Sequence, residues 1–182
     1  MIGPNGSNAK RLRDAAALTQ QAVDLFFRGD YGRALDKVER SLALNAEVGR
    51  THCAKALCLL QMGQAREALA CTEHALELDD ADAVAYTTRA MCRHRLGETQ
   101  GAEDDFARAV ELGPDDYRVF YNAACYWAER GEEEKCREYF EAAMALAPAA
   151  FAAVAAADPD LARYSGREWF REVLAEVRKR GI

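Results

Sequence analysis

The sequence predicts an all-α protein, a solenoid built from consecutive pairs of α-helices. Three observations lead to this prediction. Four glycines recur at a 34-residue interval: Gly29, Gly63, Gly97 and Gly131. Small residues and leucines keep the same interval, and Pro114 and Pro148 stand where a helix must end. An internal repeat of this length is typical of helical hairpins that bury their apolar faces against one another.

The first eight residues are predicted to form a flexible leader. Its stretch IGPNGS looks like a phosphate-binding loop, which requires Gly-x-x-x-x-Gly-Lys-Ser/Thr between a buried strand and a helix. Counted from Gly3, the place of the second glycine holds Asn8, and no apolar strand precedes it. We therefore exclude a nucleotide-binding loop and expect Ser7 or Asn8 to cap the first helix.

Residues 9–150 are predicted to form four repeats of two helices each. The repeats span about 15–48, 49–82, 83–116 and 117–150. The recurring glycine supplies the left-handed backbone just past the end of the first helix. Ala90 and Ala102 are expected where the two helices of the third repeat approach most closely, because a larger side chain would push the helices apart.

Residues 151–182 are predicted to form a degenerate fifth hairpin that caps the array, because the last apolar face needs a cover. A short alanine-rich helix should stop before Pro159. A second helix should begin near Gly166 and carry apolar residues at helical spacing: Phe170, Val173, Leu174 and Val177. Trp169 is expected either to belong to this seal or to anchor a second copy of the chain.

The repeated columns resemble the tetratricopeptide repeat. The third repeat carries the family pattern with Tyr86, Ala90, Gly97, Ala102, Phe106, Ala109 and Pro114. The fourth carries it with Phe120, Ala124, Trp127, Gly131, Phe140, Ala143 and Pro148. The first two are looser, and His52 and Arg93 replace apolar residues of the pattern. The resemblance implies a right-handed superhelical α–α solenoid, and the DPDL stretch at residues 158–161 is similar to the closing segment of some bacterial members.

The resemblance also implies a concave groove, lined by the first helix of each repeat, that binds an extended peptide or a helix. The candidate partner-binding residues, placed by the 34-residue step, are Arg50, Cys53, Leu57, Thr87, Met91, Arg95, Arg118, Tyr121, Asn122 and Cys125. The arginines would attract acidic groups, and the Asn122 amide offers both a donor and an acceptor to a peptide backbone.

One specialisation of the family is disfavoured. Its co-chaperones grip the C-terminal carboxylate of heat-shock chaperones with a Lys/Asn/Asn/Lys/Arg set. The corresponding positions here hold Thr19, Val23, Ala54, Val84 and Thr88. None of these side chains carries the charge or amide that such a clamp requires.

The composition argues against other classes of function. The net charge of -6 lacks the basic footprint of a nucleic-acid-binding protein. No stretch is long and apolar enough to span a bilayer, and residues 1–10 lack the apolar core of a secretory leader, so we expect a cytoplasmic protein without membrane contact. Because we expect no secretory leader, we also expect the six cysteines to be reduced thiols. These cysteines lack zinc-site spacing, so we expect no metal, and we expect no cofactor.

The sequence carries no constellation that indicates catalysis. The three histidines have no nucleophile motif around them, and the paired carboxylates fall on expected solvated faces. We therefore expect a non-enzymatic protein that binds a partner protein in its groove. The alternative is a structural block that self-associates through the C-terminal capping helix, as a homo-oligomer.

Overall fold

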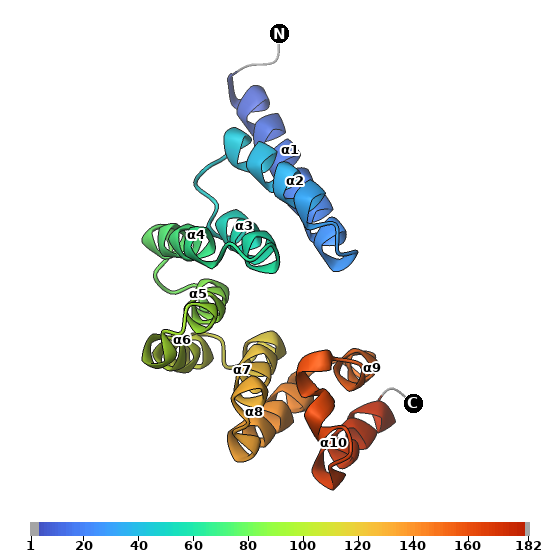
Figure 1. The fold of residues 1–182 in the computed structure, drawn as a ribbon. Helices are drawn as coiled ribbons and strands as arrows, with labels where there is room; N and C mark the ends of the chain where they lie inside the picture. The colour runs from blue at the N-terminus through green and yellow to red at the C-terminus, as the bar shows by residue number, and fades with distance from the viewer. Residues whose placement is uncertain (1–3, 181–182) are drawn as a thin grey trace. The chain divides into compact units, whose positions relative to one another are not determined.

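The computed structural model describes residues 4–180, and every regular element in that range is helical (Figure 1). The elements are α1 (Pro4–Phe27), α2 (Tyr31–Leu44), α3 (Gly49–Gln61), α4 (Ala65–Leu78), α5 (Ala83–Arg95), α6 (Thr99–Leu112), α7 (Tyr117–Arg130), α8 (Glu133–Leu146), α9 (Phe151–Ala156), the 3₁₀ helix η1 (Pro159–Tyr164) and α10 (Glu168–Lys179). The predicted all-α class is confirmed. The chain divides into an N-terminal unit, Met1–Asp105, and a C-terminal unit, Phe106–Ile182.

In the N-terminal unit, consecutive helices pack as pairs. Helix α1 lies along α2 and α3 lies along α4, while α3 also contacts both α1 and α5 (Figure 1). The first helices of successive pairs therefore touch one another, and we call α1, α3 and α5 the first-helix row. This row presents residues of the same repeat position side by side, one from each helix.

The recurring glycines have the conformation that the sequence predicts. Gly29, Gly63, Gly97 and Gly131 have φ of 78° or 79°, in the left-handed region. Each follows the first helix of its pair, where this conformation turns the chain back towards the second helix. The small residues fit the same geometry, because Ala90 and Ala102 are both completely buried. Only a side chain this small allows the two backbones to approach so closely.

Helix α1 begins earlier than the sequence suggests. It starts at Pro4, so residues 4–8 of the expected leader are helical, and positions 7 and 8 lie inside the helix rather than at its start. Proline suits the first turn of a helix, because its fixed φ is already helical and its missing N–H would have no partner there. The rest of the predicted leader, residues 1–3, lies outside the described residues.

An aromatic cluster forms the core of the C-terminal unit. The Phe140 ring of α8 is completely buried and stacks on Phe170 of α10, with ring centroids 4.8 Å apart. Trp169 packs against Phe140 at 6.0 Å, and its indole N–H donates to Glu133 at 3.0 Å. Since only 9% of Trp169 is exposed, this residue belongs to the seal and does not project towards a second copy.

Two arginines of the C-terminal segment reach back to the ends of earlier helices. Arg180 donates to the carbonyl oxygens of Met144 and Ala145, both at 2.9 Å, at the end of α8. Arg163 donates to the carbonyl of Ala128, in the last turn of α7. Carbonyls in the last turn of a helix lack intrahelical partners and carry partial negative charge, so both guanidinium groups are well placed.

Candidate partner-binding site

An apolar stripe follows the first-helix row of the N-terminal unit. Val23, Leu57 and Met91 occupy the same repeat position on α1, α3 and α5, and each is half-buried. Two more exposed apolar residues accompany them: Phe27 of α1 is 82% exposed and Val84 of α5 is 37% exposed. We call these five residues the apolar stripe. The stripe therefore lies on three helices and stays partly open to solvent.

Two of the predicted cations border this stripe. Arg50 lies in the first turn of α3 and Arg95 in the last turn of α5, and both side chains are exposed. Exposed guanidinium groups beside an apolar stripe can pair with carboxylates at the rim of a partner surface. Leu57 and Met91, also among the predicted residues, contribute the half-buried floor between them.

Two other predicted residues of this unit lie in its interior. Cys53 is 2% exposed and packs with Ala75 and Leu76 of α4 and Ala85 of α5. Thr87 is 4% exposed, and its hydroxyl donates to the Ala83 carbonyl at 2.8 Å. Both occupy the repeat position at which neighbouring first helices press together. The 34-residue step therefore placed them on the correct helices but could not distinguish the helix–helix contact from the open face.

Burial also removes the chemistry that a cysteine might bring to this surface. It raises the pKa of the Cys53 thiol to about 12, and the nearby Asp82 carboxylate acts in the same direction. A thiol that stays protonated at neutral pH is a poor nucleophile and a poor metal ligand. Cys53 therefore serves as a small apolar core residue.

In the C-terminal unit, Tyr121 of α7 is covered by the C-terminal segment. Its hydroxyl donates to Asp158 Oδ2 at 2.6 Å, and its ring meets Phe151 edge to face with centroids 4.9 Å apart. Only 8% of the residue is exposed. Burial raises the pKa of the Tyr121 hydroxyl, as do Cys125 and Asp158, so it remains a donor. Tyr121 thus holds the cap in place, which the sequence pattern did not indicate.

Cys125 lies beside two carboxylates of the same segment. Its sulfur and carboxylate oxygens of Asp158 and Asp160 all lie within 4.8 Å of one another, a grouping that could in principle hold a metal ion. Both oxygens of Asp158 already accept hydrogen bonds, one from Tyr121 and one from the backbone N–H of Asp160 at 2.9 Å. Burial, with the two carboxylates, raises the pKa of the Cys125 thiol well above its usual value. The cluster is accounted for by the N-cap of η1.

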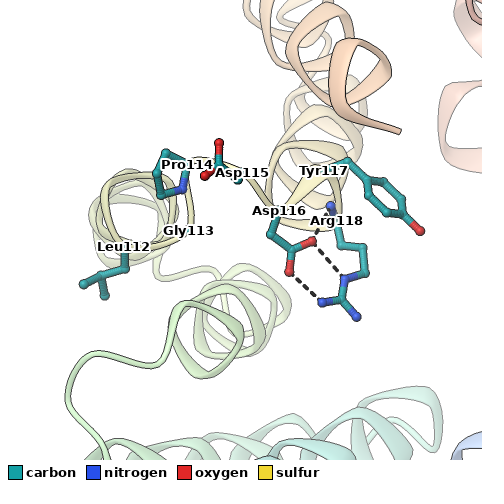
Figure 2. A pocket seen from close by; sticks show the side chains of 7 residues that line it. All are labelled: Leu112, Gly113, Pro114, Asp115, Asp116, Tyr117 and Arg118. Carbon is teal, nitrogen blue, oxygen red and sulfur yellow. Dashed lines mark hydrogen bonds and ion pairs between the residues drawn. The ribbon is translucent and has the colours of Figure 1, made fainter. Parts of the chain in front are cut away.

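Arg118 lies at the start of α7, beside an open pocket of about 590 Å³ (Figure 2). The loop that forms this pocket runs from Leu112 to Arg118. As the dashed lines in Figure 2 show, the guanidinium donates to both carboxylate oxygens of Asp116, at 2.7 and 2.9 Å. Asp116 also accepts from the backbone N–H of Arg118 and so caps α7. An acidic partner would have to compete with the Asp116 carboxylate for the Arg118 guanidinium.

Asn122, the remaining predicted residue, is half-buried on α7. The structure therefore gathers Arg50, Leu57, Met91 and Arg95 along one helix row and places Arg118 and Asn122 on α7. The exposed Phe27 is not among the residues that the repeat interval predicted. The signal was present, because Phe27 stands one 34-residue step before Gln61 and two before Arg95.

The fold and this surface define a helical-hairpin repeat protein whose first helices carry an open apolar stripe. Comparison with known proteins specifies the type of repeat. The family model described as "Tetratricopeptide repeat" matches residues 49–82, the stretch that contains α3 and α4. The chain contains a tetratricopeptide repeat and has the tetratricopeptide helical fold. No curated protein sequence matches the chain.

Solved tetratricopeptide structures resemble the chain over most of its length. A thermophilic tetratricopeptide protein of Thermus thermophilus, TTC0263, aligns with a TM-score of 0.74 and 17% identity, covering 91% of this chain and 90% of its own. The second tetratricopeptide domain of human RPAP3, in complex with an HSP70 peptide, aligns with a TM-score of 0.55 and 20% identity. This alignment covers 65% of the present chain and 97% of the RPAP3 domain. The second tetratricopeptide domain of Spaghetti, bound to an HSP90 peptide, aligns with a TM-score of 0.55 and 23% identity. This alignment covers 58% of the present chain and 97% of the Spaghetti domain.

Within residues 4–180, no helix is both long and apolar enough to cross a membrane.

Proposed function

We propose that this chain is a non-enzymatic interaction module whose first-helix row holds a peptide or helix of a partner protein. The observation that carries the proposal is the apolar stripe, which offers apolar side chains on three neighbouring helices and has the exposed Arg50 and Arg95 beside it. Burying such a stripe gains roughly 25 cal/mol per Å² of apolar area removed from water. Apolar floor and charged border resemble the centre and rim of a protein interface.

Two similar structures support the proposal by analogy. The domains of RPAP3 and Spaghetti hold chaperone peptides on the same fold. Here the positions of the carboxylate clamp lack cations and amides, with Thr19, Val23, Ala54, Val84 and Thr88 in their places. We therefore propose an apolar segment with acidic flanks as the partner, recognised along its length rather than by its terminal carboxylate.

Site-specific photo-crosslinking tests the surface directly. A benzophenone amino acid is placed at Leu57 or at Met91, and in a matched control at Ala70, an exposed residue of α4. We expect irradiation in cells to yield the same covalent partner from positions 57 and 91 and not from position 70, as mass spectrometry of the adducts would show. Adducts that are equal at all three positions, or absent at 57 and 91, would refute the assignment.

The affinity of the chain for that partner can be measured once the partner is purified. The double variant Leu57→Glu/Met91→Glu should bind at least about tenfold more weakly than wild type, because charges would replace the apolar centre of the interface. Ala70→Glu should bind like wild type. Circular dichroism of each variant verifies that the helices remain folded.

A further inference from the structure

Two histidines of the N-terminal unit meet between α3 and α4. The rings of His52, in the first turn of α3, and His74, on α4, lie edge to face with centroids 4.5 Å apart. Gly63 closes this hairpin at its other end, so the histidines lie towards the open end, where the chain enters α3 and leaves α4. The two residues are far apart in the sequence, and the fold brings their rings together.

Each histidine has a second contact that fixes one ring nitrogen. His52 Nε2 lies 2.8 Å from the carbonyl oxygen of Ala46, in the linker between α2 and α3. A carbonyl only accepts, so Nε2 must carry the hydrogen, and the neutral ring keeps its lone pair on Nδ1. His74 Nδ1 lies 3.1 Å from Glu77 Oε2 on its own helix. Protonation of His52 therefore occurs at Nδ1, on a ring that already touches another imidazole.

Burial and the neighbouring cations both oppose a positive charge on the His52 ring. Burial is the main cause that lowers the pKa of His52, and His74 and Lys55 act in the same direction, while the Ala46 carbonyl and Glu47 oppose them. Lys55 itself pairs with Glu39 of α2 at 3.1 Å. The first turn of α3 adds the positive end of the helix dipole.

We propose that the His52–His74 contact is a proton-sensitive junction. With both rings neutral it holds the open end of the α3–α4 hairpin together and ties the α2–α3 linker to α3. When His52 takes up a proton, its ring carries a partly buried positive charge against the His74 imidazole, near Lys55 and the first turn of α3, and this end of the hairpin loosens. Arg50 belongs to the same first turn of α3 as His52, so loosening of this turn in acid would reach the end of the candidate partner surface. The inference concerns the hairpin alone and stands whether or not a partner binds there.

Hydrogen exchange of the free protein tests the junction. Amides of residues 45–53 and 71–78 are followed at pH 7.5 and pH 5.5, with exchange corrected for its intrinsic pH dependence. We expect protection in wild type to fall in acid by up to about tenfold, the most that one histidine with a lowered pKa contributes one pH unit below its usual value of 6.5. His52→Gln should abolish most of that fall and His74→Gln should reduce it, whereas His94→Gln, at a histidine outside the pair, should leave it intact.

An NMR titration of the ring protons provides an independent measurement. His52 should titrate below its usual pKa of 6.5, and the value should rise in His74→Gln. The inference is overturned if wild type and His74→Gln lose protection equally between pH 7.5 and 5.5. It is also overturned if His52 titrates at 6.5 or above and is unchanged by the His74 substitution.

Discussion

Arg93 of α5 donates a hydrogen bond at 2.8 Å to Asp105, a carboxylate of α6 that is only 3% exposed. Arg89 grips the same carboxylate through two bonds, at 2.7 and 2.9 Å. Arg93 stands where the tetratricopeptide pattern has an apolar residue, and Asp105 is the reason a charge is tolerated there. An isolated buried charge would be costly, whereas this carboxylate has two cationic partners.

Asp105→Ala should therefore destabilise the N-terminal unit strongly. It leaves two partly buried guanidinium groups without their carboxylate, and we expect a loss of about 3 kcal/mol, the low end for breaking a buried pair because both arginines keep some contact with water. Urea unfolding followed by circular dichroism measures the change. Asp104→Asn, at an exposed neighbouring residue, should change stability by less than about 0.5 kcal/mol. Equal effects of the two substitutions would contradict the buried network.

Two glycines should respond in opposite ways to alanine. Gly63 has a φ of 79°, which an alanine adopts only with strain, so Gly63→Ala should cost about 1 kcal/mol. Gly32 lies within α2 and has no atom within 4 Å of an added Cβ, so Gly32→Ala should stabilise by about 0.5 kcal/mol. Thermal melts of both variants are the measurement. A stabilised Gly63→Ala variant would show that the left-handed turn is not required.

Tyr121→Phe should loosen the C-terminal segment. The change removes the hydroxyl that donates to Asp158 and leaves a half-buried carboxylate oxygen without that donor, at a cost of about 1–2 kcal/mol. Limited proteolysis should then cut residues 151–167 faster than in wild type. Tyr139→Phe, at a half-buried tyrosine of α8, controls for the loss of a hydroxyl and should leave the rate unchanged.

The buried thiols should react slowly in the folded protein. Burial raises the pKa of Cys53, Cys92 and Cys136 to about 12 and that of Cys58 to about 11, which leaves almost no thiolate at pH 8. A thiol reagent such as dithionitrobenzoate should label these four positions at measurable rates only after denaturation. Rapid labelling of any of them in the native protein, located by mass spectrometry, would contradict their burial.

The Asp116–Arg118 pair predicts a small loss of stability in acid. The hydrogen bond from Arg118 lowers the pKa of Asp116 from its usual 3.8. Because the folded pKa is below the unfolded value, the pair contributes fully above pH 3.8 and loses its contribution as the pH falls through the folded pKa. Melting temperatures between pH 2.5 and 6 should fall less steeply in Asp116→Asn, which keeps an N-cap side chain but cannot ionise. Identical slopes would show that the pair does not affect stability.

The parts of the fold that the sequence predicted are those imposed on every repeat. A hairpin of this type requires a left-handed residue after its first helix and small residues where its helices cross, so Gly63 and Ala90 recur in register and reveal the architecture. Contacts outside that register escaped prediction. Tyr121 meets Asp158 across 37 residues, a separation that the repeat interval does not contain.

The candidate site was predictable only as far as the helix that carries each residue. The step from one repeat to the next makes Leu57 and Met91 equivalent, and both are half-buried, but it assigns Cys53 to the same face although that side chain is buried. The burial of a side chain on this face depends on how closely the neighbouring first helices approach one another, and the sequence of a single protein does not specify that distance. Likewise, the polar run around Pro4 suggested a loop, although proline also suits the start of a helix.

The arginine bonds to the ends of α7 and α8 bear on how this protein can be engineered. Repeats joined by identical interfaces can be added or exchanged as cassettes, but Arg163 and Arg180 match the terminal segment to the carbonyls of one particular hairpin. A longer array would therefore be built by inserting copies upstream of α7, with α7 through α10 kept together as a single terminal cassette.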